Sequence, residues 1–406
     1  MNLRTLANVC LIIALYYFTY YVYQGIINPI PALGDSWDYH IPIAKTILDG
    51  RFLNPSDFKL PQWYYPGSSE AINALFILLH IPLTLSNIFA TCVLFFVLLK
   101  LARVFSLQDY YAIIFASAFT TLNVVVRWLN AVSIDVWVAV WFALSMVLLE
   151  NPKKNYLYFA KLGFVLGMLI GSKYTAFIFL LVLLAFYFKN IKNIIKLLTL
   201  SKFLTFFVPF SIFGLFWYIR NYIYTQNPFY PLPVLGFPGK EIFGNYRVWN
   251  VGLKYPITMF DSALAEYKMW IFVVILAFSW LVYRYIIKRQ YHIDAINKLF
   301  FLGLTNFLLY FTFPTSEQPW IMVSSFRYSF PAFIPLMLGT FLLAAKYKKE
   351  DLVGYLAVGN MIMVTSLEYH PKLVFIYIPL ALLIFYLQKK NLFLVAKKYI
   401  KKDLKI

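Results

Sequence analysis

Apolar stretches alternate with short polar segments along almost the whole chain, and many approach the length of a membrane-crossing helix, about 20 residues. The first covers residues 6–26 after Arg4, and no small-residue cleavage site follows it, so we expect a retained helix rather than a signal peptide. In all, the pattern predicts about 12 spans, within a range of roughly 11 to 13. They cover residues 6–26, 84–104, 109–127, 133–150, 156–171, 174–189, 203–220, 267–286, 296–313, 329–345, 351–367 and 373–388.

Two long polar segments interrupt this pattern, residues 27–83 and 221–265. The first contains a short helical pattern with apolar residues at 43, 47 and 48, and Asp49-Gly50 is expected to end it with the glycine as a C-cap. A second helix is expected from Ser69 to His80, with Ser68 or Ser69 as N-cap. Both helices are expected to lie on the membrane surface.

Composition agrees with the pattern. Hydrophobic residues make up 62% of the 406 residues and mean hydropathy is +0.70, well above the apolar share of a soluble domain. We therefore expect an all-α polytopic membrane protein with a single membrane domain, residues 1–388, followed by a basic cytoplasmic tail, residues 389–406.

The formal net charge of +19 raises the question of a nucleic-acid partner. Lys and Arg instead gather in short segments between apolar stretches, which is the distribution of cytoplasmic loops. This places both chain ends in the cytoplasm and residues 27–83 outside, and it argues against nucleic-acid binding.

Candidate catalytic groups concentrate in the first external segment, whose titratable side chains include Asp35, Asp38, His40, Asp49, Asp57 and Glu70. Carboxylates of this kind can serve as a general base. Four further charged residues are expected at the outer ends of spans, namely Asp135, Lys173, Arg220 and Arg327. Segments far apart in the chain therefore meet at one membrane depth, where the mouth of a helix bundle forms a site.

Purely structural interpretations remain open for two of these residues. Asp135 follows Ser133 and either residue can cap the helix that starts there. Lys173 can extend its ammonium group to the interface without contacting a substrate.

Several chemistries have no support. The chain lacks the P-loop, GxSxG and HExxH patterns of nucleotide, serine-hydrolase and zinc sites. Cys10 and Cys92 lie in apolar runs without CxxC spacing and are expected to be small buried residues rather than a disulfide, metal or redox pair.

Five motifs, taken in order, resemble the GT-C superfamily of integral-membrane glycosyltransferases, closest to the branch of protein mannosyltransferases and lipid A sugar transferases. They cover roughly residues 1–340. The motifs are Asp35-(x)3-Tyr39-His40-Ile41-Pro42, Tyr65-Pro66-Gly67-Ser68-Ser69-Glu70, Gly171-Ser172-Lys173-Tyr174-Thr175, Tyr218-Ile219-Arg220-Asn221-Tyr222 with Asn227-Pro228-Phe229-Tyr230-Pro231, and Arg327-Tyr328.

The resemblance implies a polyprenyl-phosphate-linked sugar donor, a lipid, glycan or protein acceptor, and a site on the outer face of a bacterial-type inner membrane. It implies an acid of the first external loop as general base, either Asp35, which matches by position, or Asp38. Tyr39, His40, Glu70 and Asp135 would position the base or acceptor, and Lys173, Arg220 and Arg327 would bind the donor phosphate. We expect no obligatory metal or other cofactor.

Two other classes of function remain. A secondary transporter also has many helices, although its ionisable residues usually lie near the midplane on broken helices in matching halves. A flippase or polymerase of cell-envelope glycans shares the membrane and substrate class, but it would not need the acidic loop.

Overall fold

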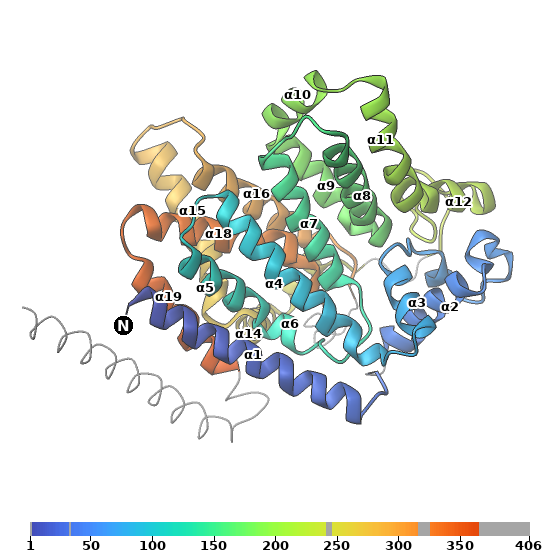
Figure 1. Ribbon diagram of the computed structural model, residues 1–406, viewed down its shortest axis with the longest axis horizontal. Helices are drawn as coiled ribbons and strands as arrows, with labels where there is room; N and C mark the ends of the chain where they lie inside the picture. Colours follow the sequence, from blue (N-terminus) through green and yellow to red (C-terminus); the bar gives the residue numbers. More distant parts are fainter. Residues whose placement is uncertain (1, 32–33, 241–245, 316–324, 365–406) are drawn as a thin grey trace, which may run out of the picture.

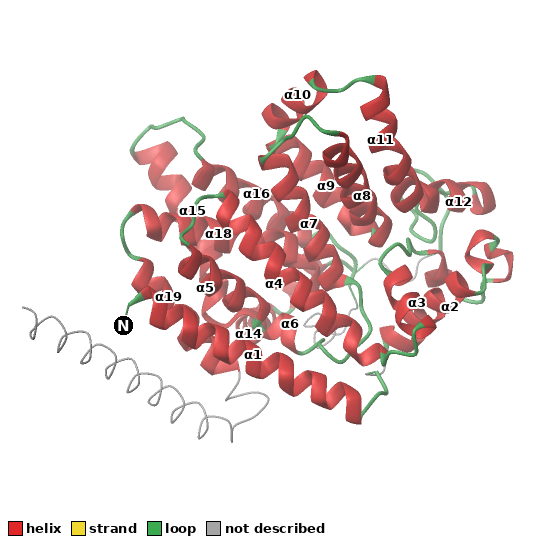
Figure 2. Cartoon of the chain, viewed as in Figure 1, coloured by secondary structure: helices red, strands yellow, loops and turns green. Residues whose placement is uncertain are grey.

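The computed structural model describes residues 2–31, 34–240, 246–315 and 325–364. The described chain is helical, and its one β pairing is an isolated bridge between Arg247 and Pro314. The predicted all-α class is confirmed (Figure 2).

Figure 1 shows the order of the helices along the chain. Those of the first half are α1 (Leu3–Ile27), α2 (Ile41–Leu48), α3 (Glu70–Leu78), α4 (Ser86–Val104), α5 (Asp109–Thr120), α6 (Asn123–Val126), α7 (Asp135–Glu150), α8 (Tyr156–Ser172) and α9 (Tyr174–Phe186). Those of the second half are α10 (Phe188–Lys196), α11 (Leu200–Phe210), α12 (Phe216–Thr225), α13 (Val248–Lys254), α14 (Pro256–Tyr267), α15 (Val273–Val282), α16 (Ala295–Tyr310), α18 (Phe330–Lys346) and α19 (Glu350–Val364). The longest connections within the first 254 residues are those between α2 and α3 and between α12 and α13.

Five helical segments in the described residues are long and apolar enough to cross a membrane, or six if a bent pair counts as one span, as expected of a multi-pass membrane protein. They are Leu3–Ile27, Leu83–Val104, Leu200–Thr225, Pro256–Ile287 and Phe326–Lys346, and the bent pair is α9 with α10. The predicted number of about 12 is therefore too high for this part of the chain. The expected span 373–388 and the tail 389–406 lie outside the described residues.

The difference has a physical cause in the lengths of the helices. Predicted span 109–127 is divided into α5 and the four-residue α6, and α5 has only 12 residues. At 1.5 Å per residue, 12 residues extend about 18 Å, well short of a bilayer core of about 30 Å. Predicted span 174–189 ends early because the chain bends by 80° between α9 and α10. Helix α5 is apolar because other helices cover it: nine of its 12 residues are buried.

Helix α7 is at the centre of the bundle, where it packs against α4, α8 and α18 (Figure 1). Thirteen of its 16 residues are buried. Because it is apolar on all sides and enclosed by other helices, it fixes the position of Asp135 at its first turn.

Glycines bring α8 against the helix formed by α11 and the π-helical turn Ser211–Leu215. A Cβ atom on Gly163 would lie 2.0 Å from the backbone oxygen of Phe206, and one on Gly171 would lie 1.8 Å from that of Phe213. With Gly167 between them, these residues form a small-residue stripe at a spacing of four, which lets helix backbones approach closely.

The first long loop folds into the two short helices that the sequence predicts, α2 and α3, near one end of the bundle (Figure 1). Gly50 follows the C-cap Asp49 with φ of +76°, so its predicted role at the end of α2 is confirmed. The predicted N-cap of α3 is wrong in its chemistry. Ser69 occupies the cap position without a capping hydrogen bond, because its hydroxyl contacts Ser172 and Trp141 instead.

Candidate functional site

The first long loop positions Asp35 through its neighbour Ser36. Ser36 is buried, and its hydroxyl donates to the carbonyl of Val132 over 3.2 Å and accepts from the Val132 amide over 3.1 Å. These two bonds fasten the loop to the segment before α7. Asp35 then lies beside Asp135, although 100 residues separate them in the sequence.

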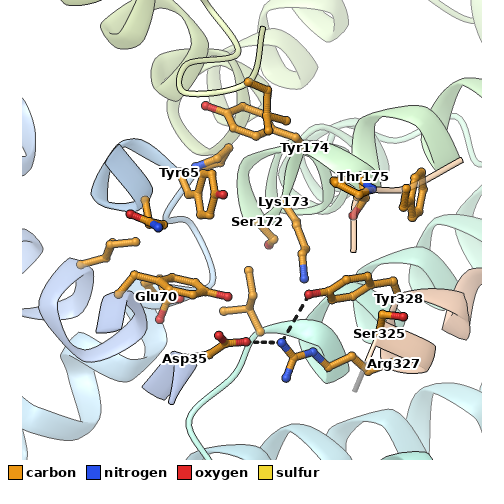
Figure 3. Close-up of a pocket in the computed structure, with 18 of the residues that line it drawn as sticks. Asp35, Tyr65, Glu70, Ser172, Lys173, Tyr174, Thr175, Ser325, Arg327 and Tyr328 are labelled. Atoms are coloured by element: carbon orange, nitrogen blue, oxygen red, sulfur yellow. Dashed lines mark hydrogen bonds and ion pairs between the residues drawn. The ribbon is translucent and has the colours of Figure 1, made fainter. Parts of the chain in front are cut away.

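Four charged side chains of alternating sign, Asp35, Arg327, Asp135 and Lys173, meet at this junction. Figure 3 shows three of them, Asp35, Arg327 and Lys173. Asp35 is paired with Arg327, and the Arg327 Nε atom lies 2.9 Å from the second Asp135 carboxylate oxygen, Oδ2. The other Asp135 oxygen accepts a hydrogen bond from Lys173 Nζ over 2.7 Å. Asp135 therefore holds both cations in place, and the four charges balance one another.

Accessibility differs among these four side chains. The side chains of Arg327 and Asp135 are 2% and 4% exposed, whereas those of Lys173 and Asp35 are 20% and 39% exposed. In this row of four charges, the two accessible members are the acid Asp35 and the amine Lys173. The two buried members, Arg327 and Asp135, hold them in place.

Aromatic rings support both cations. Lys173 Nζ lies 3.7 Å from the centre of the Tyr328 ring, and the Arg327 guanidinium lies 4.3 Å from the Trp128 ring. Cation–π contacts of this kind offset part of the cost of removing the charges from water.

The same environment shifts the ionisation of loop residues. Burial acts to raise the pKa of Asp35, but the charge and hydrogen bond of Arg327, together with the charges of His40 and Lys173, hold that pKa below its usual value. Burial, followed by the nearby Asp35 charge, raises the pKa of Tyr39. At neutral pH Asp35 is therefore a carboxylate and Tyr39 an intact hydroxyl.

A second buried pair connects α2 to α3. His40 Nδ1 is hydrogen-bonded to the Glu70 carboxylate, whose other oxygen accepts from Asn73 over 2.6 Å. Asn73 in turn accepts a hydrogen bond from Ser86. His40 and Glu70 are each 1% exposed, and the His40 Nε2 atom is buried without a hydrogen-bond partner.

A cavity of about 360 Å³ opens in front of these groups (Figure 3). Its charged lining is Asp35, Asp38, Glu70, Lys173 and Arg327, and its aromatic lining includes Tyr39, Tyr65, Tyr174 and Tyr328. Volume and mixed lining lie within the range of small-molecule sites, where a few polar groups fix the orientation of a ligand.

The structure therefore brings most of the sequence-predicted residues together. Asp35, Asp38, Tyr39, Glu70, Lys173 and Arg327 line the cavity. His40 binds one of these lining residues, Glu70, and Asp135 binds two, Lys173 and Arg327. Asp38 is exposed, and its backbone carbonyl accepts from Trp63.

Arg220 lies outside this cavity. It is buried against the first loop, where its guanidinium donates to the carbonyls of Phe52 and Tyr64. It lines a different hollow with Ser211, Ile219 and Ile223.

Some residues that hold the site carried no interpretable signal in the sequence. Ser68 donates to the carbonyl of Phe213 and accepts from the indole of Trp217 over 2.6 Å, and so fastens the start of α3 to the π-helical turn Ser211–Leu215 and to α12. Ser68 stood in a recognised motif but was interpreted as a helix cap. The GxxxGxxxG spacing of α8 was a usable signal for the close helix contact beside it.

Within the described residues, no three His, Cys, Asp or Glu side chains lie together in a group that could hold a metal ion. No known protein family, curated protein or solved structure matches the chain. The functional assignment therefore rests on the residues of the site.

Proposed function

We propose that this protein is a membrane glycosyltransferase that moves a sugar from a polyprenyl-phosphate donor to a hydroxyl acceptor in the 360 Å³ cavity. The observation that carries the proposal is the meeting of an accessible carboxylate, Asp35, and an accessible amine, Lys173, at one aromatic-lined cavity beside apolar spans. The reaction needs a base for the acceptor hydroxyl and a cation for the departing phosphate.

Asp35 acts as the base in this scheme. Its carboxylate removes the proton from the acceptor hydroxyl while the acceptor oxygen forms a bond to the anomeric carbon. The bond between that carbon and the phosphate oxygen breaks, and polyprenyl phosphate leaves with the bonding electron pair. Asp38 also lines the cavity and is the second candidate for this role.

Lys173 is the first cation for the leaving phosphate, because it is more exposed than Arg327. Arg327 is buried between Asp35 and Asp135. Its main role in this scheme is to keep Asp35 ionised and in position rather than to bind the phosphate. Asp135 prevents the two cations from separating.

The aromatic lining suits a sugar. Tyr39, Tyr65, Tyr174 and Tyr328 line the cavity, where aromatic rings can pack against the apolar face of a pyranose. The His40 and Glu70 pair stands behind Tyr39, whose ring centre is 4.2 Å from that of His40, and orients this wall.

Transfer of label tests the proposal directly. Membranes containing the protein are incubated with a panel of radiolabelled polyprenyl-phosphate sugars, and label is followed into lipid, glycan and protein fractions. For at least one donor, label should be transferred to an acceptor fraction in membranes that contain the active protein and not in membranes that lack it. Movement of an intact donor across the bilayer without transfer would instead support a flippase or transporter.

A further inference from the structure

A second hollow, of about 430 Å³, lies under α12 and is separate from the cavity that contains Asp35. Its walls are the apolar side chains of α12 and of Leu53 in the first loop, together with Ser211 and Arg220. Ile219 and Ile223 are more than half exposed. The span that contains them, Leu200–Thr225, is the least covered of the five candidate spans, with 17% of its most apolar window buried.

Arg220 is unusual because its charge has no acidic partner among the described residues. It is 3% exposed, as is Arg327. Arg327 contacts two carboxylates, whereas the Arg220 guanidinium donates only to neutral oxygens, those of Asn221, Phe52 and Tyr64.

An uncompensated buried charge is costly, and the nearby rings offset only part of that cost. The ring of Trp217 lies 4.9 Å from the Arg220 guanidinium, which contributes a cation–π contact but no negative charge. An anion bound in the hollow would supply the negative charge that the buried Arg220 guanidinium lacks.

We propose that this hollow binds the phosphate headgroup of an anionic phospholipid from the surrounding bilayer. The positive charge of Arg220 attracts a phosphate, and the exposed isoleucines in the same lining offer a surface for an acyl chain. The Ser211 hydroxyl in the same lining is buried without a hydrogen-bond partner and gives the lipid a second polar contact.

The lipid site is coupled to the cavity through the first loop. Arg220 bonds the carbonyl of Tyr64, and the next residue, Tyr65, lines the cavity. The ring of Phe52 in the same loop packs against the rings of Phe216 and Trp217 in α12. A bound lipid therefore neutralises the residue that fastens this loop, so its occupancy stabilises the loop whether or not the cavity carries out sugar transfer.

Native mass spectrometry of the purified full chain tests this proposal. The protein is equilibrated with equal amounts of phosphatidylglycerol and phosphatidylcholine, and the ratio of the two retained lipids is measured. The wild type should retain phosphatidylglycerol preferentially. Arg220→Gln should reduce that preference by about tenfold or more, because it removes a charged hydrogen-bond donor.

Arg51→Gln is the matched control. It removes a charge of the same kind from the loop that Arg220 contacts, but Arg51 is exposed and paired with Asp49, so the preference should not change. An equal loss in both variants would overturn the proposal, because it would show a response to net charge alone.

A second variant guards against misfolding of Arg220→Gln. Ile223→Trp fills the hollow from an exposed position and breaks no hydrogen bond of Arg220, so it should fold and still lose the retained lipid. Retention at the wild-type ratio in Ile223→Trp would contradict the site. Retention of an added polyprenyl phosphate but not of phosphatidylglycerol would also overturn the proposal. It would instead support a role of Arg220 in binding the donor phosphate.

Discussion

Asp35 and Asp38 lie three residues apart, line the same cavity, and differ in their partners. Asp35 is paired with a buried arginine, whereas Asp38 is exposed and contributes its backbone carbonyl to Trp63. A carboxylate held by a fixed partner is positioned more sharply than one in solvent. This contrast favours Asp35 as the base.

The variant Asp35→Asn should reduce sugar transfer by about 10²- to 10⁴-fold, because the amide cannot accept the proton. Expression and donor binding should remain, since the side chain keeps its shape and one oxygen for Arg327. Asp38→Asn is the control and should retain most activity. If Asp38→Asn is inactive and Asp35→Asn turns over normally, the base is Asp38; if both are active, the proposed mechanism is wrong.

The acid limb of the pH–rate profile should depend on Arg327. The folded-state pKa of Asp35 lies below its usual value of about 3.9, so the base stays ionised, and activity is lost only as pH falls through that lower value. In Arg327→Gln the raising effect of burial remains while the largest opposing charge is lost, so the limb should move to higher pH.

Arg327→Lys keeps the charge and is the control for this measurement. Its acid limb in kcat/KM should stay close to that of the wild type, although the rate falls with the loss of the planar guanidinium. An identical limb in the wild type and Arg327→Gln would show that the titrating group is not Asp35.

At the scale of elements, the glycine stripe of α8 determines how closely α11 and α12 approach the site. Gly171 lies at the end of α8, its carbonyl accepts from the Ser68 amide over 2.8 Å, and Lys173 follows two residues later. Displacement of α8 would therefore move the start of α3 and the amine of the cavity together.

Gly171→Ala should lower the free energy of unfolding by about 1–3 kcal/mol, because the new methyl meets the Phe213 carbonyl and the Ser68 hydroxyl. Gly359→Ala in α19 is a matched control, since no atom lies within 4 Å of its added Cβ. It should be neutral or stabilising by up to about 1 kcal/mol. Thermal unfolding in detergent measures both, and an equal effect would show that close packing at Gly171 is unimportant.

At the scale of the whole molecule, the sequence predicted the class, the two loop helices and most of the residues that meet at the cavity. An apolar chain has few charged residues. Because those at the helix ends are expected at the same membrane depth, their convergence on one site could be inferred from the sequence. The span count could not, because α5 and α7 are apolar for contact with other helices rather than lipid. Nor could the separation of Arg220, which depends on the path of loop residues 52–64.

The orientation in the membrane can be measured with single cysteines. In a background with Cys10 and Cys92 replaced, Ser56→Cys should react with an impermeant thiol reagent added outside intact cells, because residue 56 is exposed on the first loop. Lys154→Cys, also exposed, should react only after permeabilisation. The reverse pattern would place the cavity in the cytoplasm and exclude the proposed donor orientation.

The balanced chain of Asp35, Arg327, Asp135 and Lys173 also affects how a donor reaches the cavity. Two positive and two negative charges cancel at distances beyond about 10 Å, the screening length at ordinary ionic strength, so they attract no phosphate from bulk water. Exposed Asp38 adds a repulsive charge at the mouth. Capture of the proposed polyprenyl-phosphate donor would then depend on its hydrocarbon tail, which keeps the donor in the membrane and limits its diffusion to two dimensions beside the protein. Water-soluble sugar phosphates, which have no such tail, would be excluded without any dedicated filter.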